Sequence, residues 1–392
     1  MKQENEIFSL VFNDIYQIDK KISEGSFGTV FLGFNRKNSQ KVAIKIEKDK
    51  ISMYNTLYKE AQILKKIQGI AGIPRLFYCG QKFIYKAMVL ELLGLDLLQF
   101  YKRFRRFSLK TVCKIAYQLI NILQKIHEKG IVHRDLKPEN VAIGFEKGSN
   151  MIYLLDFGIA KEFLESGKHI SYQEGRPFIG TIRFASLAAH KGIELSRKDD
   201  LESLGYLFIF FLKGKLPWQN GQKLTQTDRK KMVANMKEHL KLDELCQNLP
   251  ETFNIYLKYV KNLSFKEKPN YVFLKGLFIQ LAQEMKLDLE DGIWDWTESN
   301  QINPSLSLSS SKQSQITQKD ENYESSYNKL NSLVFEKNLR DSVVVLGKID
   351  EEEKSEVPIE KIDGFEISSK KTNRENNERK LQKTIENFAE EM

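Results

Sequence analysis

The sequence predicts an α+β fold of two lobes: a small lobe formed by an antiparallel sheet with one main helix, and a larger lobe formed by helices. Residues 16–47 alternate between apolar and polar side chains around Gly25, Gly28 and Gly33, a pattern that indicates three antiparallel strands. After Gly94 the period changes, because apolar residues then recur at helical spacing. A chain of 392 residues with 41% apolar residues is long and apolar enough to bury a substantial core.

The remaining elements of the small lobe follow these three strands along the chain. Two further strands are expected over residues 76–80 and 85–91. Between the two groups of strands a helix is predicted, because apolar residues recur at helical spacing at Leu57, Ala61, Leu64 and Ile67.

In the larger lobe, Ser108 is a good N-cap residue and Gly130 is a good stop for the helix between them. The longest apolar run, Leu204 to Leu212, is interrupted only by Gly205 and is far shorter than the roughly 20 residues that a membrane helix needs. We therefore expect it to be a buried core helix, and we expect no membrane span. Further helices are expected over 199–212, 226–240, 251–263 and 270–285.

The cysteines and the first residues favour a reducing compartment. Cys79, Cys113 and Cys246 are few and scattered, so they indicate neither a disulfide framework nor a metal-ligand cluster. The N-terminal residues MKQENEIF are polar and lack the apolar stretch of a signal peptide. These features predict a cytoplasmic or nuclear protein.

Charge divides the chain at about residue 298. Residues 298–392 hold 14 Lys and Arg against 19 Asp and Glu, a net charge of −5, whereas the residues before them carry +14. The segment is also dense in Ser, Asn, Gln and Lys, and such a composition buries too little apolar surface to offset the entropy of ordering, so we expect a mostly disordered tail. The basic body favours acidic or phosphorylated substrates, or is only a soluble lysine-rich surface, and both interpretations stay open.

Two short segments carry the chemistry. Residues 133–140 read HRDLKPEN, and sixteen positions after Asn140 comes Asp156, in the tripeptide Asp-Phe-Gly. In phosphoryl transfer from ATP, Asp135 of such a loop accepts the proton of the attacking hydroxyl, while Asn140 and Asp156 hold Mg²⁺ against the transferring charge. The two segments predict a protein kinase.

The small lobe supplies the matching motifs in the expected order. Residues 23–30 form a glycine-rich hairpin whose backbone can approach phosphate oxygens, although Ser23 stands where the kinase pattern begins with glycine. Lys45 lies within an otherwise apolar strand, where an unpaired ammonium would be costly. Glu60, on the helix that follows, is the predicted partner that aims Lys45 at the α- and β-phosphates. The alternative for both residues is an ordinary surface position.

Several segments resemble the casein kinase 1 family of serine/threonine protein kinases. The usual kinase Ala-Pro-Glu after the activation segment is missing here, as it is in that family. The matching segments are Gly72-Ile73-Pro74, Tyr78-Cys79-Gly80, Glu91-Leu92-Leu93-Gly94, residues 107–112 (FSLKTV), 180–186 (GTIRFAS), 199–206 (DDLESLGY) and 216–219 (LPWQ). The resemblance implies a bilobal protein kinase fold over residues 10–297, with residues 1–9 as an N-terminal extension and 298–392 as the tail.

The resemblance also implies roles for individual residues. Lys137 would neutralise the γ-phosphate and marks serine/threonine specificity, whereas His133 would pack in the core without a chemical role. Thr181 would touch residues 133–140, the catalytic loop, and Asp200 would brace the backbone of this loop. For ATP, Leu90 would stand at the gatekeeper position, Glu91 to Leu93 would hold adenine, Val30 and Ala43 would pack on the ring, and Gly25 and Gly28 would lie closest to phosphate.

A substrate anion site is the finest of these expectations. Arg183 resembles a basic residue that binds a phosphate already present on the substrate, and Arg176 and Lys237 are expected to contribute. A guanidinium suits a phosphate because it offers paired donors. The implied substrates are proteins with acidic or phosphate-primed sites. For Arg183 the alternative is an internal salt bridge.

Other classes of protein fit less well. A pseudokinase scaffold would have lost Lys45, Asp135 or Asp156, and all three are present. A small-molecule phosphotransferase of kinase-like fold would normally lack the HRD arginine, the DFG glycine and the Leu-Pro-Trp segment together. A nucleic-acid binder would explain the basic body but not the acids, so no nucleic-acid partner is expected, and the kinase is expected to be a monomer. Leu187-Ala188 departs from the family's Ile-Asn, which leaves the anchoring of the activation segment open.

Overall fold

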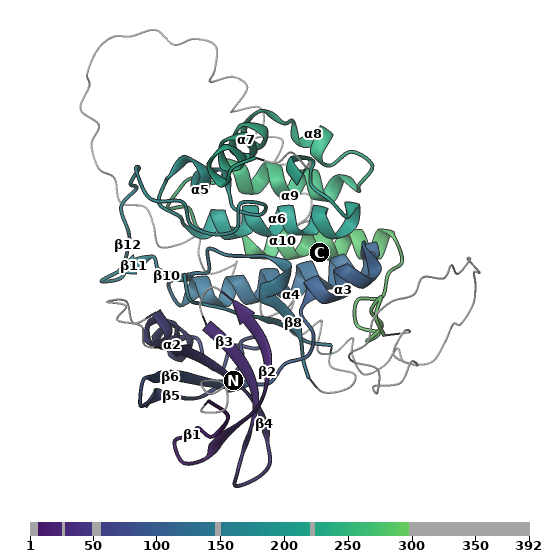
Figure 1. Cartoon of the computed structure of the whole chain (residues 1–392). Helices are drawn as coiled ribbons and strands as arrows, with labels where there is room; N and C mark the ends of the chain where they lie inside the picture. The colour runs from purple at the N-terminus through teal and green to yellow at the C-terminus, as the bar shows by residue number, and fades with distance from the viewer. Residues whose placement is uncertain (1–6, 26–27, 49–55, 146–149, 220–223, 298–392) are drawn as a thin grey trace, which may run out of the picture. The chain divides into compact units, whose positions relative to one another are not determined.

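The computed structural model describes residues 7–25, 28–48, 56–145, 150–219 and 224–297, and it confirms the predicted α+β fold (Figure 1). A small antiparallel-sheet lobe with one main helix precedes a larger helical lobe, and both belong to one compact unit. The predicted tail, residues 298–392, and the first six residues of the predicted N-terminal extension lie outside the described residues.

The small lobe is a six-stranded antiparallel sheet in the order β1-β2-β3-β4-β6-β5. The five predicted strands are present, and the two-residue strand β1 at the edge was not predicted. The predicted helix is α2, Thr56–Lys66, next to β5 and β6. The strands are β1 (Val11–Phe12), β2 (Tyr16–Gly25), β3 (Gly28–Asn35), β4 (Lys41–Lys48), β5 (Leu76–Lys82) and β6 (Tyr85–Glu91).

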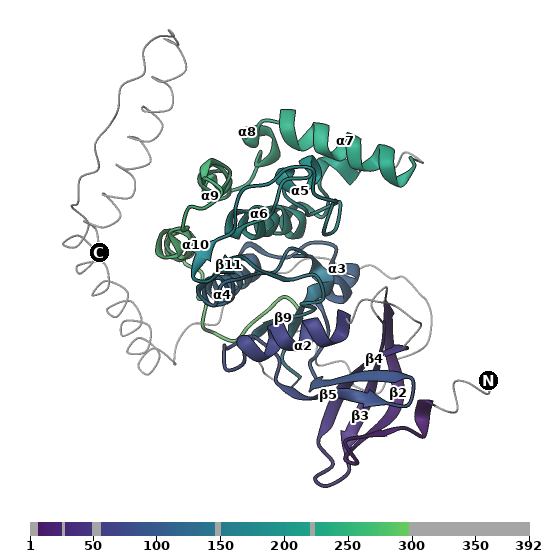
Figure 2. The ribbon, with the colours of Figure 1, turned by 90° about the vertical axis from the view of Figure 1, so that its left-hand side faces the viewer.

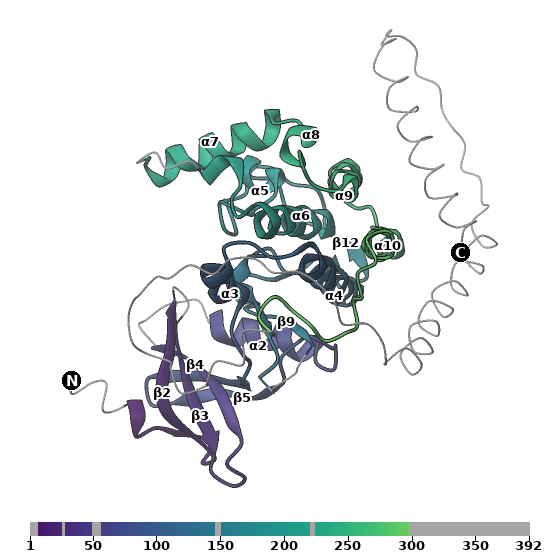
Figure 3. The same ribbon diagram turned by 90° about the vertical axis from the view of Figure 1, so that its right-hand side faces the viewer.

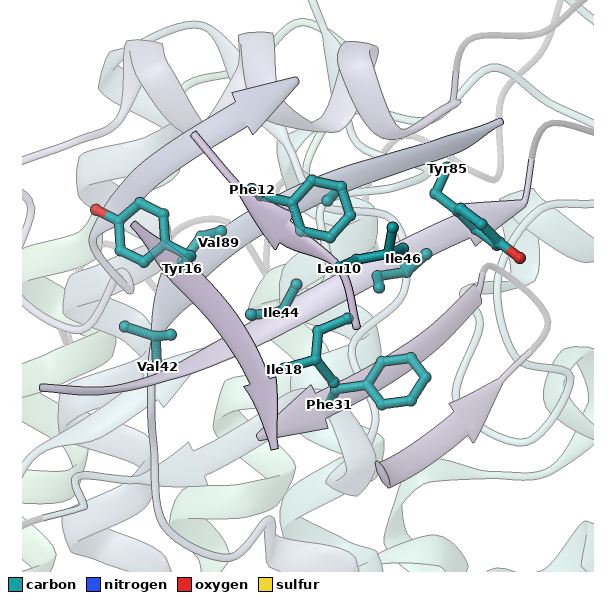
Figure 4. Packing of buried hydrophobic residues seen from close by; sticks show 11 residues of the cluster. Leu10, Phe12, Tyr16, Ile18, Phe31, Val42, Ile44, Ile46, Tyr85 and Val89 are labelled. Atoms are coloured by element: carbon teal, nitrogen blue, oxygen red, sulfur yellow. The ribbon is translucent and has the colours of Figure 1, made fainter. Parts of the chain in front are cut away.

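Alternation along β4 separates the core from the cleft. Because successive side chains of a strand point to opposite faces, Val42, Ile44 and Ile46 share one face and Ala43 and Lys45 share the other. The first three are buried in an apolar cluster with residues of β1, β2, β3 and β6 (Figure 4). Burial of this face fixes the register of the strand, and the register in turn points Lys45 away from the cluster.

The hairpin between β2 and β3 lies close against β4. Gly28 pairs with Gly25 across the hairpin and has a φ of +130°, a conformation that L side chains rarely adopt. A Cβ atom at Gly28 would lie 2.5 Å from the carbonyl oxygen of Ile46. Glycine is therefore required here by both conformation and space.

The larger lobe is mostly helical, and α4 and α10 lie side by side within it, as Figure 2 and Figure 3 show. The four predicted later helices are α6, α7, α9 and α10, whereas α3, α5 and α8 were not predicted individually. The helices are α3 (Leu97–Phe104), α4 (Leu109–Glu128), α5 (Leu187–Lys191), α6 (Arg197–Lys213), α7 (Gln226–His239), α8 (Leu242–Leu245), α9 (Glu251–Asn262) and α10 (Tyr271–Glu284).

Short strands and turns connect these helices around the catalytic loop. Pro138–Asn140 and Pro217–Gln219 are single turns of 3₁₀ helix. The apolar run in α6 is buried, as predicted, and no helix in the described part of the chain is long and apolar enough to cross a membrane. The short strands are β7 (Ile131–Val132), β8 (Val141–Ile143), β9 (Ile152–Leu154), β10 (Lys161–Glu162), β11 (Leu164–Glu165) and β12 (Lys168–His169).

The start of α4 is tied to the last described residues. Ser108 is the N-cap, as predicted, and its Oγ accepts a hydrogen bond from the Thr111 amide at 3.2 Å. The Asp295 carboxylate accepts hydrogen bonds from the amide and the hydroxyl of Ser108, at 2.7 and 2.6 Å. Trp296 stacks on Phe100 of α3, with ring centroids 4.4 Å apart. Residues 295 and 296 therefore pack as part of the helical lobe.

Candidate active site

A cleft of about 1520 Å³ lies between the sheet and the helical lobe. One wall of the cleft comes from the face of the sheet opposite the apolar cluster. The facing wall comes from the catalytic loop and β8. The residues predicted to contact adenine and phosphate line it: Gly28, Val30, Ala43, Leu90, Glu91 and Leu93. Gly25 ends β2 opposite Gly28, and residues 26 and 27 lie outside the described residues. An apolar slot with adjoining polar groups is the usual form of a nucleotide site.

Lys45 forms the predicted ion pair with Glu60. Its Nζ lies 2.7 Å from Glu60 Oε2 and 3.1 Å from Asp156 Oδ1, so one ammonium joins β4, α2 and the Asp-Phe-Gly segment. Burial alone lowers the pKa of Lys45, but the two carboxylates outweigh burial and hold that pKa above its ordinary value. Burial alone raises the pKa of Asp156, and here Lys45 outweighs it, so the net pKa lies below the ordinary value. Lys45 is therefore protonated and Asp156 is ionised at neutral pH.

Thr181 and two residues of the catalytic loop hold the Asp135 carboxylate from both sides. Thr181 donates its hydroxyl to Asp135 Oδ1 at 2.7 Å, and Lys137 Nζ lies 2.5 Å from Oδ2. Asn140 donates its amide nitrogen to the Asp135 backbone oxygen at 2.9 Å and to Oδ2 at 3.3 Å. The contact predicted between Thr181 and the catalytic loop is thus made on Asp135 itself. These contacts fix the orientation of the acid before any substrate arrives.

Asp200 braces the backbone of the same loop, as predicted. Its two carboxylate oxygens accept from the amides of His133 and Arg134, both at 2.8 Å, and Oδ2 also lies 2.9 Å from His127 Nε2. Arg134 has a φ of +70°, which is costly for a residue other than glycine, and the hydrogen bonds to Asp200 hold it there. Burial alone raises the pKa of Asp200, but the hydrogen bond and charge of His127, the charge of His133 and the Arg134 amide together outweigh burial and lower the net pKa.

His133 packs in the core, as predicted. Its ring is fully buried, lies edge-on to Phe157 with centroids 5.0 Å apart, and places Nε2 2.9 Å from the Leu155 carbonyl. The Asp135 amide donates to His133 Nδ1 at 3.3 Å. Both ring nitrogens are thus used for structure, which leaves neither for proton transfer.

Glu194 is a structural centre that the sequence analysis missed. Its side chain is only 4% exposed, and it lies 2.9 Å from Lys161, 3.1 Å from Arg176 and 4.0 Å from Arg134. Burial alone raises the pKa of Glu194, but the three cations outweigh it and lower the net value. The cluster joins the catalytic loop, β10 and the segment between β12 and α5, which contains Arg176. No local pattern signals it, because its members are spread over 60 residues of sequence.

The three residues of the predicted anion site have different surroundings in the structure. Arg176 is engaged by Glu194. Lys237 is 2% exposed and donates to the carbonyl oxygens of Ile182 and Ala185, so its ammonium does not face solvent. Arg183 remains partly exposed, with its guanidinium over the rings of Phe184 and Phe210, and within the described residues it forms no ion pair with a carboxylate. The internal salt bridge considered for Arg183 is therefore absent from that part of the chain.

The predicted magnesium ligands, Asn140 and Asp156, both line the cleft. Because the amide nitrogen of Asn140 donates to Asp135, its side-chain oxygen is the atom left to meet a cation. A carboxylate and an amide oxygen suit Mg²⁺, which is usually held by one or two protein oxygens together with substrate phosphates and water. No cluster of three or more His, Cys, Asp or Glu side chains suited to a metal occurs among the described residues.

Comparison with known proteins gives a consistent answer. The protein kinase domain family matches residues 16–284. Casein kinase I homolog 2 of Schizosaccharomyces pombe is 41% identical over 286 residues, and casein kinase I homolog 3 of the same yeast is 40% identical over 287 residues. Each match covers 72% of this chain and 65% of the relative, so the chain spans slightly less than two thirds of the length of these relatives.

Proposed function

The chain belongs to the protein kinase family, and we propose that it is a serine/threonine protein kinase of the casein kinase 1 family that uses ATP. The observation that carries the proposal is the convergence, in one cleft, of the Lys45–Glu60–Asp156 group and the loop that holds Asp135. A pseudokinase scaffold is not supported, because each residue whose loss would define it is present and in contact with its partners.

The reaction follows from the positions of these groups. A substrate hydroxyl oxygen forms a bond to the γ-phosphorus, the bond from that phosphorus to the β–γ bridging oxygen breaks, and the hydroxyl proton passes to Asp135. Lys137, beside Asp135, balances negative charge on the moving phosphoryl group, and Lys45 holds the phosphates that stay behind. Asn140 and Asp156 would hold Mg²⁺, which would supply further charge neutralisation when bound.

Serine and threonine are the proposed acceptors, and acidic or phosphate-primed proteins are the proposed substrates. Arg183 supports the second part, because the residue is partly exposed and has no carboxylate partner among the described residues. It also lies two residues from Thr181, which contacts the proposed base. A phosphate bound at Arg183 would therefore sit on the segment that adjoins the reacting hydroxyl, and the net charge of +14 before residue 298 favours such substrates.

Phosphate transfer from labelled ATP tests the proposal directly. The full chain, with Mg²⁺, is offered matched peptides that carry a serine, a threonine or a tyrosine acceptor, each with and without a phosphoserine three residues earlier. We expect label on serine and threonine, little on tyrosine, and more on the primed than on the unprimed peptide. Labelling of none of the peptides by the intact chain contradicts the proposal.

Replacement of Arg183 by alanine tests the substrate preference separately. We expect the KM for a phosphate-primed peptide to rise by about 10- to 100-fold, because a charge-assisted hydrogen bond to phosphate contributes roughly 1.5–3 kcal/mol. The KM for an unprimed, uncharged peptide and the KM for ATP are expected to change less than about 2-fold, and these two values serve as internal controls. An equal rise with primed and unprimed peptides would show that Arg183 only supports the local fold.

A further inference from the structure

The segment that follows Thr181 lacks the Ala-Pro-Glu by which kinases usually end the activation segment, so some other group must hold it. Ser186 caps the short helix α5, and Glu202 of α6 accepts from the Leu187 amide at 3.0 Å and from the Tyr206 hydroxyl at 2.7 Å. These contacts hold the end of the segment. They leave open what holds Ile182 to Ala185, between Thr181 and the cap.

Lys237 of α7 fills that place. Its Nζ donates to the carbonyl oxygens of Ile182 at 3.1 Å and of Ala185 at 2.6 Å. The same ammonium lies 4.9 Å from the centre of the Tyr206 ring and 5.0 Å from that of Trp218, which are positions suited to cation–π attraction. Helix α7 adjoins α5 and the Pro217–Gln219 turn, and it lies at the end of the helical lobe away from the sheet (Figure 3).

A buried ammonium of this kind has a structural cost that only good partners offset. Burial lowers the pKa of Lys237 to about 7, while the two carbonyl oxygens favour the charged form. The titratable groups around it are His190 of α5, Glu202 of α6 and Lys261 of α9. His190 Nε2 lies 3.3 Å from Nζ, and burial lowers the pKa of His190 to about 4, so this neighbour is neutral.

The two carbonyls that Lys237 holds belong to the segment that contacts the proposed base, Asp135. Ile182 directly follows Thr181, whose hydroxyl donates to Asp135 at 2.7 Å. Arg183 lies between the two carbonyls, and its own carbonyl accepts from Trp218 Nε1 at 2.8 Å. A shift of this backbone would therefore move both the group that orients the base and the proposed phosphate-binding arginine.

We propose that Lys237 is a positioning residue: its buried ammonium clamps the carbonyls of Ile182 and Ala185, holding Thr181 against Asp135 and Arg183 at the substrate side. The clamp serves in place of the missing Ala-Pro-Glu anchor. The expected change in kcat rests on the proposed kinase function, whereas the clamp itself is a set of contacts that does not depend on that function. It also replaces the expectation that Lys237 binds substrate phosphate directly.

Three variants of the full chain test the clamp by kinetics. Lys237→Met keeps the length and packing of the side chain but removes its donors, Lys237→Arg keeps charge and donors, and Lys231→Met alters an exposed lysine of the same helix. We expect Lys237→Met to lower kcat by about 10- to 100-fold, the scale reported for small misplacements of catalytic groups. The KM for ATP is expected to change less than about 2-fold, because Lys237 does not line the nucleotide cleft. Lys237→Arg should restore part of the rate, and Lys231→Met should match the original chain.

Hydrogen–deuterium exchange supplies a readout that does not depend on activity. In Lys237→Met we expect faster amide exchange in peptides covering residues 180–187, with unchanged exchange in peptides covering 41–48. Unchanged exchange over 180–187 in Lys237→Met overturns the clamp. An equal fall in kcat in Lys237→Met and Lys231→Met overturns it as well. If Lys237→Met does not fold, Lys237→Gln is measured instead; because its amide keeps donors but no charge, a smaller change over 180–187 is expected, and no change again overturns the clamp. If the original chain phosphorylates none of the peptides but Lys237→Met still shows faster exchange over 180–187, the kinase proposal is refuted and the clamp stands.

Discussion

Replacement of Asp135 by asparagine is expected to lower kcat by about 10²- to 10⁴-fold, the usual contribution of a general base. The amide matches the carboxylate in shape and still offers one oxygen to the Thr181 hydroxyl, but it cannot take the proton of the attacking hydroxyl. Since Asp135 does not line the nucleotide cleft, the KM for ATP should change little. Steady-state transfer of labelled phosphate to the primed serine peptide measures both quantities.

A matched control separates loss of the base from loss of the fold. Asp243→Asn makes the same chemical change at an exposed position of α8 and is expected to leave kcat unchanged. Binding of ADP, followed by calorimetry, should be equal in the original chain, Asp135→Asn and Asp243→Asn. A kcat for Asp135→Asn within about 3-fold of the original would rule out Asp135 as the base.

The sequence predicts the parts of this fold whose cause is local. Alternation along β4 places Lys45 among apolar neighbours, where an unpaired ammonium would be costly, and the helix that follows supplies its acidic partner, Glu60. Ser108 likewise predicts the start of α4, because its hydroxyl accepts a hydrogen bond from a first-turn amide that has no partner within the helix. The short helices α3, α5 and α8 were not predicted one by one, since they span too few residues for a helical period to emerge.

The residues that sequence reasoning missed or misplaced depend on contacts between distant segments. Glu194 collects cations from residues 134, 161 and 176, and no spacing within the chain reveals that they meet. Lys237 looks like any other lysine of a polar helix, yet tertiary packing buries it and turns it toward the carbonyls of another segment. The family resemblance placed Lys237 at the substrate-binding surface, because a sequence pattern locates a residue only along the chain. Whether the side chain is buried depends on which segments pack over it.

Replacement of Lys45 by methionine is expected to reduce both activity and stability. The side chain of Glu60 is only 4% exposed, so loss of the ammonium leaves a buried carboxylate without its counter-charge. Such a change costs about 3–5 kcal/mol of the free energy of unfolding. The kcat should fall by about 10²- to 10³-fold, because the group that holds the phosphates in place is lost. Urea unfolding and steady-state kinetics measure the two effects, with Lys41→Met, an exposed lysine on the same strand, as the control.

The double variant Lys45→Met/Glu60→Gln separates the two roles of this ion pair. A neutral amide at residue 60 removes the uncompensated buried charge, so most of the lost stability should return, whereas the kcat should stay as low as in Lys45→Met. Stability and activity would then be lost through different atoms of one contact: stability through the carboxylate left behind, and activity through the ammonium removed. Recovery of kcat together with stability would mean that Lys45 serves only to neutralise Glu60, and it would remove Lys45 from the set of residues that hold phosphate.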